Sequence, residues 1–232
     1  MAVGGVRLVE KRIGCSLVIL AAWLLSAPAL ASQPFIVPVE MDEARLGKHL
    51  SYLEDPDESL TLAAVMSAEI SHRFTQSEVD TPNFGFTGLR TWFVVTLSNP
   101  SKESLERLVE ISQPTLDRIG VFVVSGDDGQ LNVQLELGDH KPFAARPIQH
   151  RHFLVPIEMA PGESLKVVFR IDTEGTMRVP VSLWQPQAFF ERDATESIAF
   201  GIYYGLMLVM AAYNLFVFAS LRDRSYLYYV LI

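Results

Sequence analysis

The 232-residue sequence is almost without cysteine: its single thiol, Cys15, lies inside an apolar segment near the N-terminus. A disulfide needs two cysteines and a thiolate zinc site needs several, so the sequence excludes both kinds of crosslink. A domain formed by the rest of the chain must therefore be stabilised by its hydrophobic core.

Several functional signatures are also missing. The net charge is -8 and the basic residues form no clustered stripe, which argues against nucleic-acid binding. The sequence has no G-x-S-x-G, no H-E-x-x-H and no glycine-rich phosphate loop, and no spacing of carboxylates singles out a catalytic pair. We therefore predict neither an enzyme nor a cofactor.

The N-terminus has the pattern of a secretory signal peptide. Arg7, Lys11 and Arg12 precede the apolar run IGCSLVILAAWLLS, and Ala29-Leu30-Ala31 follow it after Pro28. The run is short for a membrane span, although an anchor helix is the alternative. We predict a signal peptide over residues 1–31, and its removal would change the net charge from -8 to -10.

A second apolar block lies at the C-terminus. No charged side chain occurs between Ser197 and Leu221, a length of roughly 37 Å as a helix, which is enough to cross a bilayer. Arg222 and Arg224 follow at once, and positive charge stays in the cytoplasm. We predict a first transmembrane helix over 197–221, running from outside to inside, and the start of a second over 225–232.

This span carries features of a helix that packs against other helices. Gly201 and Gly205 form a G-x-x-x-G pair, which allows close approach of a neighbour. Tyr203 and Asn214 lie on roughly the opposite side, where polar groups facing lipid would be costly. We predict helix packing through Gly201, Gly205 and Asn214; a simple anchor with two glycines is the alternative.

Between these blocks the sequence predicts an antiparallel β-domain over 32–190. Short segments alternate apolar and polar residues and are separated by turn sequences such as Asn99-Pro100 and Pro161-Gly162. Many short strands of this kind are typical of a β-sandwich or barrel. The strongest strand segments are 91–100, 105–112, 116–124, 131–138, 151–159, 164–172 and 179–184. One exception, Thr61–Ala68, is predicted to be a single helix capped by Thr61.

Four residues are candidates for a ligand pocket: Trp92, Arg146, Arg178 and Trp184. An aromatic face beside guanidinium groups would suit a sugar or another polar ligand. Core packing is the alternative explanation for each of the aromatic residues.

Two other motifs contain residue types that can bind a metal. His150 and His152 would share one face of a strand, but a third ligand is not identifiable, so two exposed histidines at a strand start are the favoured interpretation. Asp127-Asp128-Gly129 lacks the alternating acidic positions of a calcium loop and indicates a hairpin turn. We predict no metal.

Together these parts resemble the bacterial seven-transmembrane receptors with diverse intracellular signalling modules. In the β-domain the resemblance rests on TWFVVTLSNPSKESLERLVEISQPTLDRIGVFVV, with a Trp-x5-Asn pattern offset by one residue from Trp92 to Asn99. The membrane part is the more specific match, through Gly201–Gly205, Tyr213-Asn214 and the segment Arg222–Tyr229. The resemblance implies a jelly-roll sensor, similar to a carbohydrate-binding module, over most of 40–186.

The resemblance also implies a chain that continues through seven helices into a kinase, cyclase or related output domain, so we interpret this sequence as the sensor end of a partial receptor. The predicted location is the bacterial inner membrane with the β-domain in the periplasm. The predicted partners are the membrane and either a small sugar-like ligand or a periplasmic protein, with a homo-oligomer left open. A tethered hydrolase and a binding or adhesive module without a signalling role are the alternatives.

Overall fold

The computed structural model describes residues 33–126 and 129–231, and the predicted signal peptide lies outside them. The larger sheet contains β1 (Phe35–Ile36), β3 (Ser51–Asp55), β4 (Thr75–Gln76), β6 (Arg90–Ser98), β8 (Arg118–Ser125), β9 (Leu131–Leu137) and β11 (Ser164–Asp172). The smaller sheet contains β2 (Glu43–Arg45), β7 (Leu105–Ile111), β10 (Phe153–Met159) and β13 (Val181–Trp184). A ribbon of β5 (Asn83–Gly85) and β12 (Met177–Arg178) completes the strands found in the described residues.

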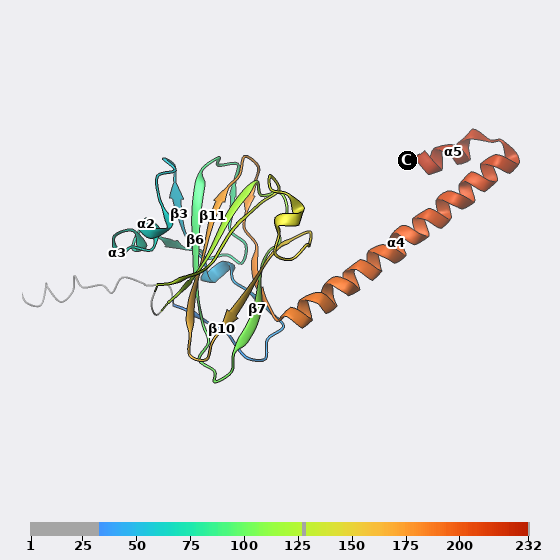
Figure 1. Cartoon of the computed structure of the whole chain (residues 1–232). Coiled ribbons are helices and arrows are strands. Elements are labelled where there is room, and N and C mark those ends of the chain that lie inside the picture. Colours follow the sequence, from blue (N-terminus) through green and yellow to red (C-terminus); the bar gives the residue numbers. More distant parts are fainter. Residues whose placement is uncertain (1–32, 127–128, 232) are drawn as a thin grey trace, which may run out of the picture.

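The two sheets pack face to face, with strand orders β4-β3-β6-β11-β8-β9 and β10-β7-β13-β2, as Figure 1 shows. Every pair along these two orders is antiparallel, and β1 adds to β6 in parallel. The domain is therefore a mainly β, antiparallel sandwich, as predicted. The seven strand segments expected from alternation correspond to β6, β7, β8, β9, β10, β11 and β13.

The core lies between the sheets because the strands alternate in burial. On β6, Phe93, Val95 and Leu97 point inward and are fully buried, with Phe93 opposite Phe169 of β11. Each such side chain contributes roughly 2 kcal/mol on burial. Trp92 points the other way and packs in a second cluster on the outer face of the larger sheet.

That second cluster is covered by the region predicted to be one helix. The structure has two short helices there, α2 (Leu62–Val65) and α3 (Ala68–Ser71). Thr61 caps α2 as expected, because its hydroxyl accepts from the Ala64 N–H. The helix ends early since the Ser67 hydroxyl donates to the Ala64 carbonyl and Ser67 itself is extended, starting the next helix.

Asn99, which follows β6, joins two loops at one end of the sandwich. It is fully buried, and its side-chain N–H groups donate to the carbonyls of Glu103, Met159 and Ala160 at 2.8–3.1 Å. Its side-chain oxygen accepts from the N–H and hydroxyl of Ser101. Asn99 is therefore a structural residue that holds the β6–β7 and β10–β11 connections together.

We expect Asn99→Ala to lower the free energy of unfolding by about 3 kcal/mol, because one buried and two part-buried carbonyls lose their donor. Urea unfolding followed by tryptophan fluorescence on the whole chain in nanodiscs would measure this. Ser101→Ala, which removes one partner at the rim, is the control and should cost about 1 kcal/mol. A loss for Asn99→Ala no larger than that of the control would contradict the role assigned to Asn99.

The remaining described helices are two single turns, η1 (Gly47–His49) and η2 (Phe143–Ala145), and the C-terminal pair α4 (Pro186–Leu221) and α5 (Arg224–Leu231). α4 begins with Pro186 in its first turn, where a missing N–H costs nothing. A charged stretch from Glu191 to Glu196 precedes the charge-free 197–221 segment, and of the whole helix only Phe189 is buried. Arg222 adopts a left-handed conformation that ends α4, and α5 turns back (Figure 1).

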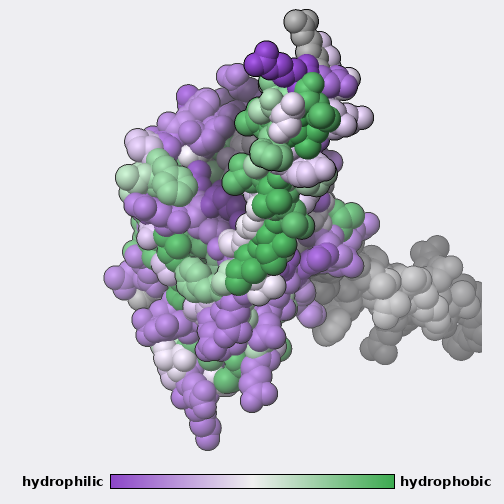
Figure 2. All heavy atoms as spheres, turned by 90° about the vertical axis from the view of Figure 1, so that its right-hand side faces the viewer, coloured by the Kyte–Doolittle hydropathy of each residue, from purple (hydrophilic) through white to green (hydrophobic). Residues whose placement is uncertain are grey.

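Beyond its base, α4 projects from the sandwich with apolar side chains on all sides. Figure 2 shows it as a green hydrophobic band against a mostly hydrophilic domain. Among the described residues it is the one helix with the length and apolar character to cross a membrane. Gly201 and Gly205 are open to approach, and the Asn214 side chain donates to the Met210 carbonyl of its own helix. Their packing against further helices stays a prediction.

A polar cavity at the base of the membrane helix

The outer face of the smaller sheet carries polar side chains where the inner face carries core residues. On β7, Glu110 alternates with the buried Val109 and Ile111. The strand register then places Ser182 of β13 between Glu110 and Arg45. Because strand neighbours share a face, these three side chains form one polar row across the sheet.

The first turns of α4 lie over this row and enclose a cavity of about 390 Å³. The sheet contributes Glu43, Arg45, Glu110, Ser182 and Trp184 to its wall. The helix contributes Phe189, Arg192, Asp193 and Glu196. His150, Arg151 and His152, just before β10, and Arg178 of β12 line the remaining sides. The cavity is thus shared between the sandwich and the helix that continues into the membrane.

Glu110 is the most buried acidic group of the cavity. Its two carboxylate oxygens contact separate partners: Nδ1 of His152 lies 2.6 Å from one, and Trp184 Nε1 donates to the other at 2.7 Å. Burial disfavours the charged carboxylate, but the hydrogen bonds from His152 and Trp184 and the positive charge of Arg192 outweigh it and lower the pKa of Glu110. Glu110 is therefore a carboxylate at neutral pH.

A set of ion pairs fastens the helix to the sandwich. Asp193 lies 3.1 Å from Nε2 of His150 and 3.0 Å from the guanidinium of Arg151. Arg151 also contacts Glu196 at 2.7 Å. On the next side of the helix, Arg192 bonds Glu43 of β2 at 3.2 Å.

Aromatic packing lies beneath these ion pairs. Phe189 packs edge-on against Trp184 and His150, with ring centroids 5.7 and 5.2 Å away, and contacts Leu108 and Leu154. The guanidinium of Arg192 lies 5.0 Å from the Trp184 ring. The helix base is therefore held by one apolar anchor and a ring of charges.

Two of the four predicted ligand residues, Arg178 and Trp184, line this cavity. The structure places the other two elsewhere. Trp92 is 1% exposed on the outer face of the larger sheet, where it donates to Asp55 and stacks on Phe122.

Arg146 lies outside the cavity but next to its histidine segment. Its guanidinium lies over the rings of Phe143 and Phe153 and donates to the backbone carbonyls of His150 and Arg151. Arg146 therefore holds the segment that supplies the cavity histidines.

The prediction that the two histidines of this segment are exposed was wrong. His150 and His152 are partly buried, their rings are 5.2 Å apart, and each contacts a carboxylate more than forty residues away. The paired spacing was visible in the sequence, whereas Glu110 and Asp193 had no local signal. Their roles depend on strand register and on where the helix docks.

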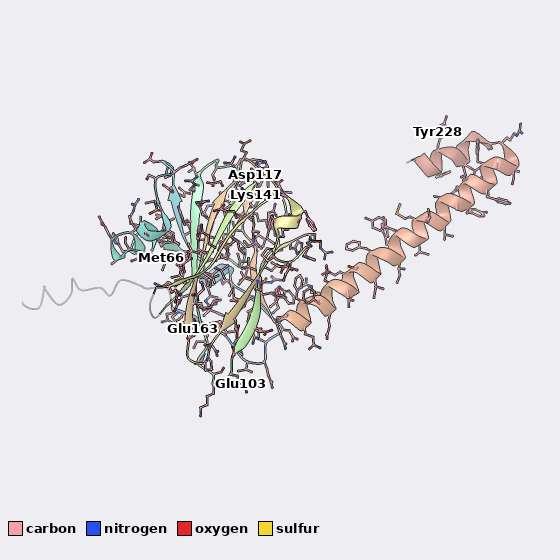
Figure 3. The ribbon with its side chains drawn as sticks, in the orientation of Figure 1. Met66, Glu103, Asp117, Lys141, Glu163 and Tyr228 are labelled. Carbon is pink, nitrogen blue, oxygen red and sulfur yellow. The ribbon has the colours of Figure 1, made fainter. Side chains whose placement is uncertain are left out.

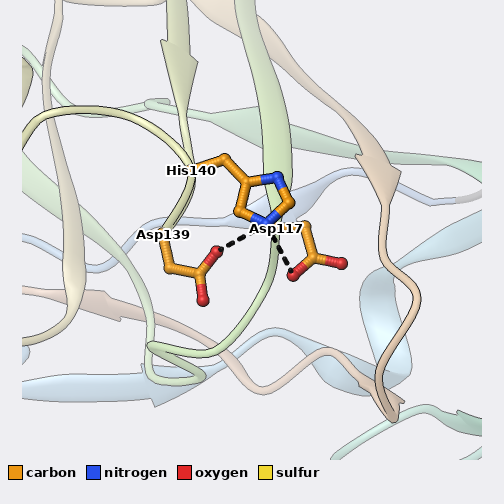
Figure 4. Close-up of side chains that lie close together, drawn as sticks. All are labelled: Asp117, Asp139 and His140. Carbon is orange, nitrogen blue, oxygen red and sulfur yellow. Dashed lines mark ion pairs between the residues drawn. The ribbon is translucent and has the colours of Figure 1, made fainter.

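A second cluster of ionisable groups lies at the end of the sandwich that carries Asp117 and Lys141, opposite Glu103 and Glu163 (Figure 3). In Figure 4, Nε2 of His140 lies 3.7 Å from Asp117 and 3.8 Å from Asp139. All three ligand atoms lie within 4.8 Å of one another. The Asp117 carboxylate also accepts from the Thr173 hydroxyl and the Glu174 N–H, so hydrogen bonding across strands explains its position.

Comparison with protein families explains this combination of a sandwich and an apolar helix. Residues 47–185 match the model described as 7TMR-DISM extracellular 2, and residues 196–232 match 7TM diverse intracellular signalling. The chain belongs to the 7TMR-DISM family. The sandwich is thus the extracellular sensor domain of a membrane receptor, and α4 leads into its membrane domain.

Solved structures similar to this 7TMR-DISM chain are remote. The carbohydrate-binding module CsCBM6-3 of Clostridium stercorarium, in complex with cellobiose, has a TM-score of 0.27 and 13% identity over 45% of this chain and 81% of its own. The family GH115 4-O-methyl-alpha-glucuronidase BtGH115A has a TM-score of 0.26 and 13% identity, covering 45% of this chain and 14% of its own. A search of curated proteins found no match.

Proposed function

We propose that this 7TMR-DISM receptor binds a small polar ligand in the cavity and that occupancy changes how α4 is held. The observation that carries the proposal is the shared wall: Arg192, Asp193 and Glu196 of the helix face the same space as Glu110 and Trp184 of the sandwich. A ligand there would contact both parts at once.

Such a ligand would signal only if it bound two arrangements of the helix with different affinity. The cavity supplies a physical route to that difference. Asp193 and Glu196 already pair with Arg151, and Arg192 pairs with Glu43. A polar ligand that bonds any of these groups competes with the ion pairs that fasten the helix, and so shifts the balance between docked and released states.

The location and partners follow from the same proposal. The sandwich lies in the periplasm and α4 crosses the inner membrane toward the cytoplasm, consistent with Arg222 after the span. We assign no catalysis to this portion, because the cavity carboxylates are engaged in ion pairs and hydrogen bonds. Self-association through Gly201 and Gly205 is part of the proposal.

The test measures hydrogen–deuterium exchange of the whole chain in nanodiscs with and without compounds from a panel of sugars, sugar acids, sugar phosphates and amino acids. A compound that binds should change exchange of the amides of 187–196 and leave those around Asn99 unchanged. Ser112→Phe, which fills the cavity, should abolish the change, whereas Thr96→Phe, on the outer face of the larger sheet, should not.

Binding that survives Ser112→Phe would place the ligand elsewhere and contradict the cavity. Binding that Ser112→Phe abolishes but that leaves α4 unchanged would favour the alternative, a tethered binding module without a signalling role. Failure of the whole panel to bind would turn the search to a periplasmic protein partner.

A further inference from the structure

The carboxylates that line the cavity all have a partner within the protein, whereas some of its arginines have none among the described residues. Its wall contains five carboxylates, and each already has a basic partner: Glu43 pairs with Arg192, Asp80 with Lys48, Glu110 with His152, and Asp193 and Glu196 with Arg151. Each acidic group that lines the cavity is therefore already engaged by a basic side chain, with Glu43, Asp193 and Glu196 sharing Arg151 and Arg192.

Two arginines of the same wall have no such partner. Arg45 of β2 and Arg178 of β12 make no hydrogen bond or ion pair through their side chains within the described part of the chain. Arg151 and Arg192, the other two cavity arginines, each contact two carboxylates. The charged side chains of the wall that are left without a partner are thus both cationic.

The free arginines come from segments that the fold brings together. Arg45 lies opposite Ser182 on the outer face of the smaller sheet, and Arg178 precedes β13 by three residues. The hydroxyls of Ser112 and Thr81 line the cavity near them without a hydrogen bond to another described residue. Two guanidinium groups and two hydroxyl groups are therefore available to bind a ligand.

We infer that the cavity ligand is a small hydroxylated anion, a sugar acid or sugar phosphate, whose carboxylate or phosphate pairs with Arg45 and Arg178. A guanidinium presents parallel N–H donors that match either anionic group in a two-point contact. The ligand's hydroxyls face Ser112 and Thr81, and its anionic group competes with Asp193 and Glu196 of α4 for Arg151. The volume of about 390 Å³ admits one such molecule.

This inference rests on the proposed function and names the ligand class for the same cavity. The test titrates the full chain in nanodiscs by calorimetry with glucuronate, glucose 6-phosphate and glucose. Glucose is the neutral control, because it has the same sugar ring as both anions and no charge. Arg45→Gln and Arg178→Gln keep side-chain length without the charge. Arg118→Gln is the control, because Arg118 is an exposed arginine of β8 in the larger sheet.

We expect at least one anion to bind more tightly than glucose, with each cavity variant weakening it about 10- to 100-fold and Arg118→Gln leaving it unchanged. Affinity should also fall as salt rises from about 0.01 M to about 0.15 M, where the screening length shrinks from roughly 30 Å to 8 Å. The tighter of glucuronate and glucose 6-phosphate identifies the anionic group.

Tighter binding of glucose than of either anion would overturn the inference, and so would anion binding that survives both substitutions. Neither result would contradict the proposal that the cavity binds a ligand. Silence of both anions would also overturn it. The proposed function fails by a different result, a bound compound that ignores Ser112→Phe, so the two failures are distinguishable.

Discussion

Replacing Glu110 with alanine should lower the free energy of unfolding by about 4 kcal/mol, among the largest effects of any single substitution outside the core. The change leaves the buried Trp184 Nε1 without an acceptor and removes the carboxylate that His152 contacts at 2.6 Å. An unsatisfied buried donor costs about 1–3 kcal/mol, and each lost hydrogen bond to a charged group costs about 1.5–3 kcal/mol. Urea unfolding of the whole chain in nanodiscs, followed by fluorescence, measures the loss.

Glu136→Ala is the matched control. Glu136 of β9 also pairs with a basic residue, Arg170 at 2.9 Å, but its side chain is 39% exposed. Pairs of this kind contribute about 1 kcal/mol or less. Equal losses for the two variants would show that the Glu110 network is not buried in the way the structure describes.

Replacing Glu110 with glutamine should change the pH dependence of stability. The folded protein holds the pKa of Glu110 below its ordinary value, so the carboxylate stabilises the fold above that ordinary value. This stabilisation is lost as pH falls through the folded pKa. A stability profile measured from neutral to acidic pH should therefore fall less steeply in Glu110→Gln than in the natural protein, and an identical slope would contradict the assignment.

Phe189→Ala should release the base of α4. Phe189 is 4% exposed and packs against Trp184, His150, Leu108 and Leu154. Truncation of a buried phenylalanine costs about 3 kcal/mol or more. Because Phe189 is the one buried residue described in α4, that cost falls on the docking of the helix. We expect the amides of 187–196 to exchange about 100-fold faster by hydrogen–deuterium exchange.

The adjacent residue provides the control. Phe190 has the same side chain but is 49% exposed, so Phe190→Ala removes similar volume without an anchor. Its exchange rates should stay within a few-fold of the natural protein. Equal acceleration by both variants would mean that helix propensity, and not docking, determines the opening.

The sequence alone determined the features that depend on local pattern. Alternation of apolar and polar residues located seven strands, because each strand of a sandwich has one face in the core. The charge-free run after Ser197 marked the span, since a bilayer imposes a minimum apolar length. The six short strands β1 to β5 and β12 were not predicted, because two to five residues carry too little periodicity.

The candidate site depended on contacts that no local pattern encodes. Trp184 and Arg178 were identified by residue type, and the structure brings both to the cavity, while Trp92 and Arg146 lie elsewhere. Residue type does not say which face of which sheet a side chain occupies. Trp92 and Phe93 are neighbours in sequence and lie on opposite faces of one sheet.

What the sequence determined about this protein is its class, an exported β-sandwich joined to a membrane helix. What only the tertiary structure decided is where the two parts meet. Glu110 and His152 are 42 residues apart and His150 and Asp193 are 43 apart, and strand register and helix docking join them around one cavity. Long-range pairing of this kind arises from packing of the whole domain, which is why the charges at the base of α4 become a site only in the folded chain.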